Sequence, residues 1–282
     1  GQERLNMNHN TRPLWLLRQA RQLVYPRRCP FCGRVLGFLP TCEECAPALD
    51  LLRRSPSMRL NSAQHLLHDL DGAAAPYRYS GPVRRAVLTA KYHNAPWAAE
   101  ELGVEMAHLL FGSEVVMRGA EPLPRPVEGY ERGYQLILPV PPSNRRRGYN
   151  VPERMARPLS AALGVPLRTD LLFRVRSRRK QEGLTLEERL ENVTNAFQAA
   201  HPEQLENKRI LLIDDVITTG ATISACAHTL LQAGAESVYA MAFATVEPAP
   251  SASNPSPPSG EHTAPEPSDL DPAPDEDDLF DF

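Results

Sequence analysis

The sequence predicts an α/β protein whose parallel sheet is flanked by helices, with a small cysteine-rich unit before it and an acidic tail after it. Three observations support this prediction. Strand-like and helix-like apolar patterns alternate over residues 73–247, as they do in parallel sheets with crossover helices. Four of the five cysteines form two Cys-x2-Cys pairs within residues 29–45. Residues 248–282 are mostly Pro, Ser, Ala and acidic residues.

The length and composition are ordinary for a soluble globular chain. The 282 residues are 42% hydrophobic and have room for one or two domains. No apolar run approaches the ~20 residues that are needed to span a membrane, so we expect no membrane insertion. The first residues, GQERLNMNHN, lack the pattern of a secretory signal peptide. We therefore expect a cytoplasmic protein.

The net charge of −3 conceals an uneven distribution, since residues 248–282 hold nine acidic residues and no Lys or Arg. The rest of the chain is therefore basic, which favours binding of a polyanion but is also usual for a solvated surface. The tail cannot bury enough apolar surface to offset the entropy of ordering, so we predict that it is disordered. Its last part, DEDDLFDF at 275–282, is a candidate docking segment for DNA-processing proteins. A purely solubilising tail is the alternative.

The N-terminal part divides into three predicted segments. Residues 1–25 end in apolar residues at helical spacing with arginines between them, which predicts an amphipathic segment that packs on the body, with binding to a membrane surface as the alternative. Residues 26–50 contain the cysteine pairs. Residues 51–72 are polar and irregular, which predicts a linker to the α/β unit.

The α/β unit, residues 73–247, has recognisable signals at several predicted helix ends. Ser80 is a suitable N-cap, Gly164 a suitable C-terminal stop, and TLEE at 185–188 has the spacing of a capping box. Residues 118–134 are rich in Pro, Gly and charge, which predicts a surface insertion. The predicted strands are 73–80, 135–140, 171–175, 209–214 and 237–244, and the predicted helices are 82–93, 97–111, 151–163, one that begins at 185, and 222–233.

The last strand, helix and strand of this series predict one right-handed βαβ unit. Ile210 to Ile213 is an apolar run, and two acids, Asp214 and Asp215, follow it directly. A small hydroxylic loop at 218–222 then precedes the helix. Ligands of parallel sheets bind outside the carboxyl ends of the strands, which is where these polar groups fall.

These groups suit a ligand that carries both a phosphate and a sugar. Loop N–H groups, the helix N-terminus and Thr hydroxyls can donate to phosphate oxygens, and Gly220 permits a close approach of the backbone. Asp214 and Asp215 can accept from ribose hydroxyls or hold Mg²⁺, which prefers oxygen ligands. An ordinary turn after a strand is the alternative, but adjacent acids repel one another and need a reason to be placed together.

The run from Arg209 to Ala225, RILLIDDVITTGATISA, resembles the 5-phosphoribosyl diphosphate (PRPP) motif of type I phosphoribosyltransferases. It is not a P-loop, because the Gly-Lys-Ser/Thr ending is absent. The resemblance implies a type I phosphoribosyltransferase-like sheet in which Asp214 and Asp215 contact the ribose hydroxyls. It also implies a set of residues that cradle the 5-phosphate: Thr218, Thr219, Gly220, Ala221 and Thr222.

The cysteine pairs, Cys29 with Cys32 and Cys42 with Cys45, predict a zinc site. Two hairpin-like knuckles can present four thiolates to one tetrahedral Zn²⁺, and four protein ligands leave no open position, so the metal is expected to be structural. Disulfides and a redox Cys-x-x-Cys are the alternatives, and a reducing compartment argues against the first. Cys226 stands apart, and we expect it in the core.

The cysteine pairs and the PRPP-like motif together resemble the ComF family of competence proteins, over about residues 26–246. Further matches to the family are Ala90-Lys91-Tyr92, Pro139 to Pro141, RRRGYN at 145–150 and QEGLTLEERLENVTNAF at 181–197. The resemblance implies a zinc ribbon joined to a phosphoribosyltransferase-like domain. It also implies a role in DNA uptake during natural transformation, in which the protein handles incoming single-stranded DNA.

Cationic residues are available for the pyrophosphate of PRPP. The loop after Val140 is the candidate pyrophosphate loop, and Arg is suited to bidentate phosphate contacts. The basic run 174–180 is a candidate lid, although exposed arginines are commonly just solvated surface. The residues that we expect to support the pyrophosphate are Lys91, Arg145, Arg146 and Arg147.

The sequence leaves the reaction open. Phosphoribosyl transfer expels pyrophosphate from the anomeric carbon, and Mg²⁺ with cationic side chains stabilises the departing charge. The acceptor is not encoded in any recognisable pattern, so an enzyme of nucleotide metabolism and a non-catalytic PRPP sensor that binds nucleic acid are both alternatives. Single-stranded DNA has candidate contacts at arginines near the cysteine unit: Arg27, Arg28, Arg34, Arg53 and Arg54.

Overall fold

The computed structural model describes residues 26–55, 57–62, 64–93, 95–130, 133–143, 148–175 and 196–247. Outside these residues lie the predicted amphipathic segment 1–25, Arg145 to Arg147, residues 176–195 with the helix predicted from 185, and the tail 248–282. The chain divides into two units after Glu247, and every described element belongs to the first. No helix of the described part is long and apolar enough to cross a membrane.

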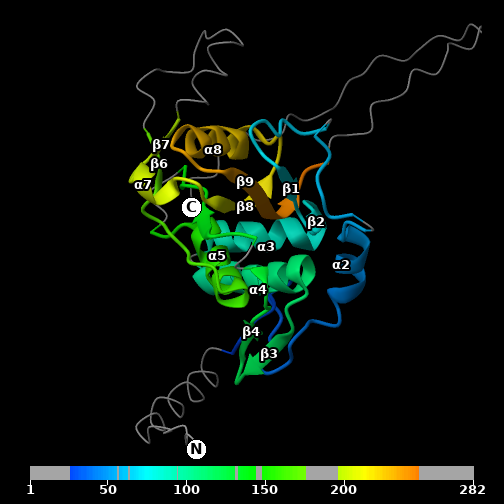
Figure 1. The fold of residues 1–282 in the computed structure, drawn as a ribbon. Coiled ribbons are helices and arrows are strands. Elements are labelled where there is room, and N and C mark those ends of the chain that lie inside the picture. The colour runs from blue at the N-terminus through cyan, green and yellow to red at the C-terminus, as the bar shows by residue number, and fades with distance from the viewer. Residues whose placement is uncertain are drawn as a thin grey trace, which may run out of the picture. The chain divides into compact units, whose positions relative to one another are not determined.

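A parallel sheet of five strands forms the centre of the first unit (Figure 1). Its order is β1-β9-β8-β5, and β2 continues alongside β9 beyond β1. All of its pairings are parallel, which confirms the predicted sheet type. The strands are β1 (Gly72–Ala74), β2 (Tyr77–Arg78), β5 (Leu136–Pro139), β8 (Arg209–Ile217) and β9 (Ser237–Thr245).

The predicted strand at 73–80 is divided into β1 and β2. Ala74 pairs with Met241 and Tyr77 pairs with Ala244, and Pro76 lies in the interruption between them. Proline has no N–H to donate to a ladder, so it interrupts the pairing on this side of β9.

Helices cover both faces of the sheet, as Figure 1 shows. The apolar residues of β8 alternate between the faces: Leu211 and Ile213 belong to one core cluster, and Ile210 and Leu212 to the other. The first cluster includes residues of three helices and the second includes residues of α8. These helices are α3 (Gly81–Tyr92), α4 (Pro96–Phe111), α5 (Val151–Leu163) and α8 (Ala221–Gln232).

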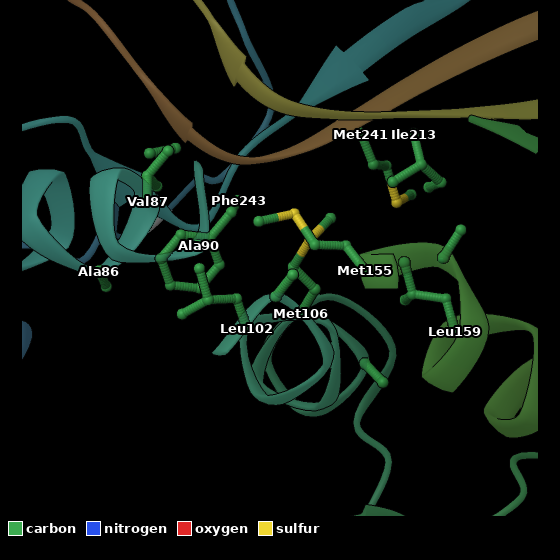
Figure 2. Packing of buried hydrophobic residues seen from close by; sticks show 14 of the residues in the cluster. Ala86, Val87, Ala90, Leu102, Met106, Met155, Leu159, Ile213, Met241 and Phe243 are labelled. Carbon is green, nitrogen blue, oxygen red and sulfur yellow. The ribbon is translucent and has the colours of Figure 1, made fainter. Parts of the chain in front are cut away.

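Methionine and leucine side chains fill the space between the sheet and the first group of helices. Figure 2 shows Met155 of α5 and Met106 of α4 beneath Met241 of β9, and Met155, Met106 and Phe243 are all buried. Such long flexible side chains fill irregular gaps in a core.

Gly164 ends α5 in a left-handed conformation, with φ of 66°, as its position in the sequence predicted.

Two antiparallel hairpins and two short helices complete the described fold. The predicted surface insertion begins with the hairpin of β3 (Val115–Arg118) and β4 (Glu121–Pro124). The predicted strand at 171–175 is β6 (Leu172–Arg174), which pairs with β7 (Phe197–Ala199). The short helices are α2 (Ala46–Leu52) and α7 (Pro202–Leu205).

Gly103 lets α4 and α5 approach closely, and its replacement by Ala is expected to destabilise the fold. A Cβ at this position would lie 2.2 Å from the carbonyl oxygen of Met155, which no side-chain movement can relieve. Overpacking of this kind costs about 1–3 kcal/mol or more. Gly133→Ala is the matched control, because the nearest atom to its Cβ would be at 3.4 Å. Urea unfolding should show a lower midpoint for Gly103→Ala alone, and equal midpoints for the two variants would contradict this packing.

Candidate functional site

Asp214 and Asp215 lie within β8, near its carboxyl end. The strand continues past them to Ile217 because Val216 still pairs with Ala244 of β9, so it is longer than the predicted 209–214. Asp215 is buried and Asp214 is half-buried. The backbone N–H of Asp215 donates to the Asp214 Oδ1 at 2.8 Å. The two acids therefore stand at the edge of the sheet where ligands of parallel sheets bind.

The two carboxylates point to opposite faces of the sheet, as neighbouring residues of a strand do. Asp215 faces α3, where the Lys91 Nζ lies 2.9 Å from its Oδ1. Burial lowers the pKa of Lys91, but the negative charge of Asp215 outweighs this effect and raises it. Lys91 is thus a cation held against the acid pair by the last turn of α3.

Asp214 has an unusual ionisation. Burial, and then the charge of Asp215, raise its pKa from 3.8 to about 7. The N–H of Asp215 and the charges of Lys91 and Arg174 offset only part of this rise. Near neutral pH this carboxyl group therefore exchanges a proton readily, and a bound cation or sugar hydroxyl could take the place of that proton.

The predicted phosphate loop follows directly. Thr218 and Thr219 are exposed, and Gly220 adopts a left-handed conformation, with φ of 90°, just before α8 begins at Ala221. The Ala221 N–H donates to the Thr219 Oγ1 at 3.4 Å. The first N–H groups of a helix have no acceptor within the helix, so they are available to an anion. The sequence placed this loop correctly between the strand and the helix.

The candidate pyrophosphate loop leaves the same edge of the sheet, because Pro139 of β5 pairs with Ile213 of β8. Arg145 to Arg147 lie outside the described residues. The Asn150 side chain donates to the Val140 carbonyl at 2.9 Å and so joins the two ends of the loop. Tyr149 donates its hydroxyl hydrogen to the carbonyl of Ala90, beside Lys91. The sequence showed the motif that contains Tyr149 and Asn150, but it did not indicate these contacts.

Arg174 is the described end of the predicted lid. Its guanidinium lies 4.6 Å from the centre of the Phe197 ring, a cation–π contact across the β6–β7 hairpin. Its Nε is buried and has no hydrogen-bond partner among the described residues. Its charge, like that of Lys91, also lowers the pKa of Asp214.

The four predicted cysteine ligands come together. Their sulfur atoms all lie within 4.8 Å of one another, and the Cys29–Cys45 and Cys32–Cys42 sulfur pairs are each 3.8 Å apart. Four sulfurs at about 2.3 Å from a tetrahedral Zn²⁺ would be about 3.8 Å apart. All are free thiols, since a disulfide would bring two sulfurs to about 2.05 Å. The cluster could therefore hold a metal such as Zn²⁺.

Backbone turns build the cluster. The Cys29 N–H donates to the Arg34 carbonyl at 2.7 Å and the Gly33 N–H to the Cys29 carbonyl at 2.8 Å, which forms the first knuckle. The Cys45 N–H donates to the Cys42 carbonyl at 3.1 Å and closes the second. Burial raises the pKa of Cys29 to about 11, so this thiol ionises at neutral pH only when a cation replaces its proton. Cys226 is buried in the core, as predicted.

A cavity of about 830 Å³ lies between the cysteine unit, α4, β4 and α5. Neither the acid pair nor the phosphate loop lines it. Trp97 and Leu123 line it, together with a buried ion pair in which the Arg27 Nε lies 2.8 Å from the Glu101 Oε1. None of the residues that the sequence predicted for PRPP or metal lines this cavity.

Comparisons with known proteins identify the α/β unit. Residues 146–254 match the phosphoribosyl transferase domain. The chain is 27% identical over 233 residues to competence protein F of Haemophilus influenzae, a match that covers 77% of this chain and 89% of the relative. It is also 27% identical over 228 residues to DNA utilization protein YhgH of Salmonella typhi, with 79% of this chain and 92% of the relative covered.

Solved structures with similarity include the allosteric regulatory enzyme of purine biosynthesis, at 20% identity and a TM-score of 0.34. That match covers 52% of this chain, which spans only 25% of the enzyme's length. Orotate phosphoribosyltransferase of Mycobacterium tuberculosis is 16% identical, with a TM-score of 0.28 and coverage of 70% of this chain and 81% of the other.

The sheet, its flanking helices and the N-terminal four-cysteine cluster agree with the predicted fold class. The similarity to competence protein F and to YhgH extends over most of the chain. These findings confirm the resemblance to the ComF family: residues 146–254 match the phosphoribosyl transferase domain, and most of the chain is similar to competence protein F.

Proposed function

We propose that the chain binds PRPP together with Mg²⁺ at the carboxyl end of β8. One observation carries the proposal: two adjacent carboxylates stand at the end of a parallel strand, three residues before a Thr-Gly loop that opens a helix. The match to the phosphoribosyl transferase domain supports it. The carboxylates suit the ribose hydroxyls or Mg²⁺, and the loop N–H groups suit the 5-phosphate.

The proposed roles follow the chemistry of the groups. Asp214 and Asp215 hold the ribose, and Thr218 to Thr222 bind the 5-phosphate. Arg145 to Arg147, which follow β5, bind the pyrophosphate. Bound Mg²⁺ would supply positive charge to the departing pyrophosphate. Lys91, whose Nζ lies 2.9 Å from the Asp215 Oδ1, balances the charge of this carboxylate, and we propose that it also contributes positive charge toward the pyrophosphate.

The proposal is tested by calorimetric titration of the full chain with PRPP in the presence of Mg²⁺. We expect saturable binding that weakens at least tenfold when EDTA replaces Mg²⁺, because the uncompensated phosphates would then face Asp214 and Asp215. Ribose 5-phosphate, which lacks the pyrophosphate, should bind more weakly. Release of pyrophosphate on addition of candidate bases or oligonucleotides would identify a transferase, and binding without release would identify a sensor. Absence of PRPP binding with Mg²⁺ would remove the proposal.

The relatives' names favour a second function, the handling of DNA. Competence protein F and DNA utilization protein YhgH suggest that this chain also contacts incoming single strands. The predicted arginine contacts are less available than the sequence suggested. Four of the five form ion pairs with carboxylates of this chain: Arg27 with Glu101, Arg34 with Glu44, Arg53 with Asp50, and Arg54 with Glu247. DNA phosphates would have to displace these carboxylates.

Single-strand binding has a clear salt signature. Each phosphate contact contributes a slope of about −0.7 to the dependence of log affinity on log salt. Titration of a labelled oligonucleotide from 50 to 200 mM salt should therefore show a steep loss of affinity. A flat response would count against direct phosphate contact.

Metal analysis of the purified chain tests the remaining proposal, one structural Zn²⁺ per chain at the cysteine cluster.

A further inference from the structure

The segment predicted as a linker packs against the phosphate loop. We call residues 61–69, of which residue 63 is outside the described part, the strap. The Leu66 N–H donates to the Thr219 carbonyl at 2.7 Å. Ser224, on the first turn of α8, donates its hydroxyl hydrogen to the Leu66 carbonyl and accepts from the His68 N–H at 3.0 Å. The strap is thus tied to the loop and to the helix that the loop opens.

Gly220 shows how close this contact is. A Cβ on Gly220 would lie 2.7 Å from the Leu66 carbonyl oxygen, closer than real Cβ atoms come to such atoms. Glycine at this position is therefore required for two reasons, its left-handed φ of 90° and the presence of the strap.

A second connection runs from the strap to the strand that precedes the loop. His65 is only 4% exposed, and its Nε2 lies 3.1 Å from the Thr245 Oγ1 and 3.2 Å from the Val246 carbonyl. The Thr245 hydroxyl donates its hydrogen to the Ile217 carbonyl at 2.9 Å. Because the Val246 carbonyl can only accept, the contacts at Nε2 are satisfied when this nitrogen carries the proton and donates it. This chain of bonds ends at Ile217, the residue before Thr218.

These contacts use most of the buried polar side chains in the described part of the protein. Five polar or charged side chains are buried there, and three of them are His65, Ser224 and Thr245. A fourth is Asp215 of the acid pair. Burial of polar groups is unfavourable unless they are hydrogen-bonded, so such a network is expected where the backbone must be fixed.

We infer that His65 and Ser224 are positioning residues, which hold the phosphate loop in the shape that receives the 5-phosphate. The inference deepens the proposed function and rests on it. Amide donors stabilise an anion best when they are already oriented before the ligand arrives. The strap fixes the loop at both flanks, through Ile217 on one side and through Thr219 and Ser224 on the other.

The test compares three variants that alter the contacts between the strap and its neighbours with a control on α8, the helix of Ser224. Ser224→Ala removes both bonds to the strap, and His65→Leu removes the bond to Thr245. His65→Gln restores a donor at nearly the same place and should recover binding. Thr229→Ala is the control, because among the described residues the Thr229 hydroxyl bonds to the Ala225 carbonyl of its own helix, at 2.9 Å.

Two ligands and one ligand-free measurement are used. PRPP with Mg²⁺ engages the loop through its 5-phosphate, whereas pyrophosphate with Mg²⁺ does not. We expect Ser224→Ala and His65→Leu to weaken PRPP binding about tenfold or more and to leave pyrophosphate binding within about twofold. Hydrogen exchange of the ligand-free chain should show faster exchange of the 218–223 amides in both variants and unchanged exchange in Thr229→Ala.

The outcomes separate this inference from the proposed function. If the wild type binds PRPP and both Ser224→Ala and His65→Leu bind it equally well, the inference is wrong and the proposed function stands. Equal loss of PRPP and pyrophosphate binding would show general loss of structure and would also overturn it. If the wild type binds no PRPP, the proposed function fails, and unchanged hydrogen exchange at 218–223 would then overturn the positioning role independently.

Discussion

Asp214→Asn is expected to make the ligand-free protein more stable above pH 7 and to weaken PRPP binding at least 100-fold. The folded chain raises the pKa of this carboxyl group from 3.8 to about 7, through burial and the charge of Asp215. An acid with a raised pKa in the folded state destabilises that state when it ionises. Asparagine carries no charge, so it removes this penalty, and it also replaces a carboxylate oxygen that we propose as a contact of the ribose or Mg²⁺.

The stability difference between Asp214→Asn and the wild type should change with pH in a definite direction. The penalty is fully present above pH 7 and declines as the pH falls from about 7 toward 3.8, where both states of the wild type become protonated. The melting temperature of Asp214→Asn should therefore exceed that of the wild type most at pH 8 and by less at pH 5. Thermal melts at both pH values and a PRPP titration at pH 8 measure the two effects.

Asp170→Asn is the matched control for removal of a carboxylate. A hydrogen bond from Arg168 lowers the pKa of Asp170, the opposite direction to Asp214, and Asp170 is exposed. This variant should be no more stable than the wild type at pH 8, and its PRPP affinity should be unchanged. If Asp214→Asn melted at a lower temperature than the wild type at pH 8, ionised Asp214 would not destabilise the folded state, and this account of Asp214 would be wrong.

Removal of the metal is the second large effect that we expect. Cys45→Ser should abolish zinc binding at the proposed site and lower the melting temperature by about 10 °C or more, since loss of a structural metal is among the largest single-site effects. The cysteine unit also packs on the sheet: the rings of Phe31 and Phe243 are 6.2 Å apart, and Cys29, Cys42 and Cys45 belong to the same core cluster. Loss of the metal should therefore loosen that side of the fold.

Cys226→Ala is the matched control for this experiment. Cys226 lies on α8 and is buried in the other core cluster. Its replacement should therefore leave the zinc content at one ion per chain. Metal analysis and thermal melts of both variants provide the measurement. Undiminished zinc in Cys45→Ser, or a wild type that carries no zinc when purified without chelator, would exclude the proposed zinc site.

The sequence predicted the sheet where local patterns decide its strands and the ends of its helices. The apolar run Ile210–Ile213 predicted β8, and Gly164 predicted the end of α5. Pairing with β9 extends β8 through the acids, which no local pattern reveals. The β3–β4 hairpin was missed because Pro122 and Pro124 are unusual in strands, yet β4 pairs on one side only, where proline is tolerated.

Contacts made by the backbone were harder to predict. Leu66 bonds to the phosphate loop through its N–H and carbonyl, so its side chain gives no signal, and the polar segment around it was interpreted as a linker. The pairing of Lys91 with Asp215 joins residues far apart in the sequence. Family resemblance pointed to Lys91, but only the packing of α3 against the sheet explains which acid it contacts.

The location of PRPP in a crystal of the complex with Mg²⁺ tests the central claim most directly. The 5-phosphate should lie within hydrogen-bonding distance of the backbone N–H groups of residues 218–222, with the ribose hydroxyls against Asp214 and Asp215. Ligand density in the cavity beside Trp97, or at the loop with the ribose turned away from both acids, would contradict it.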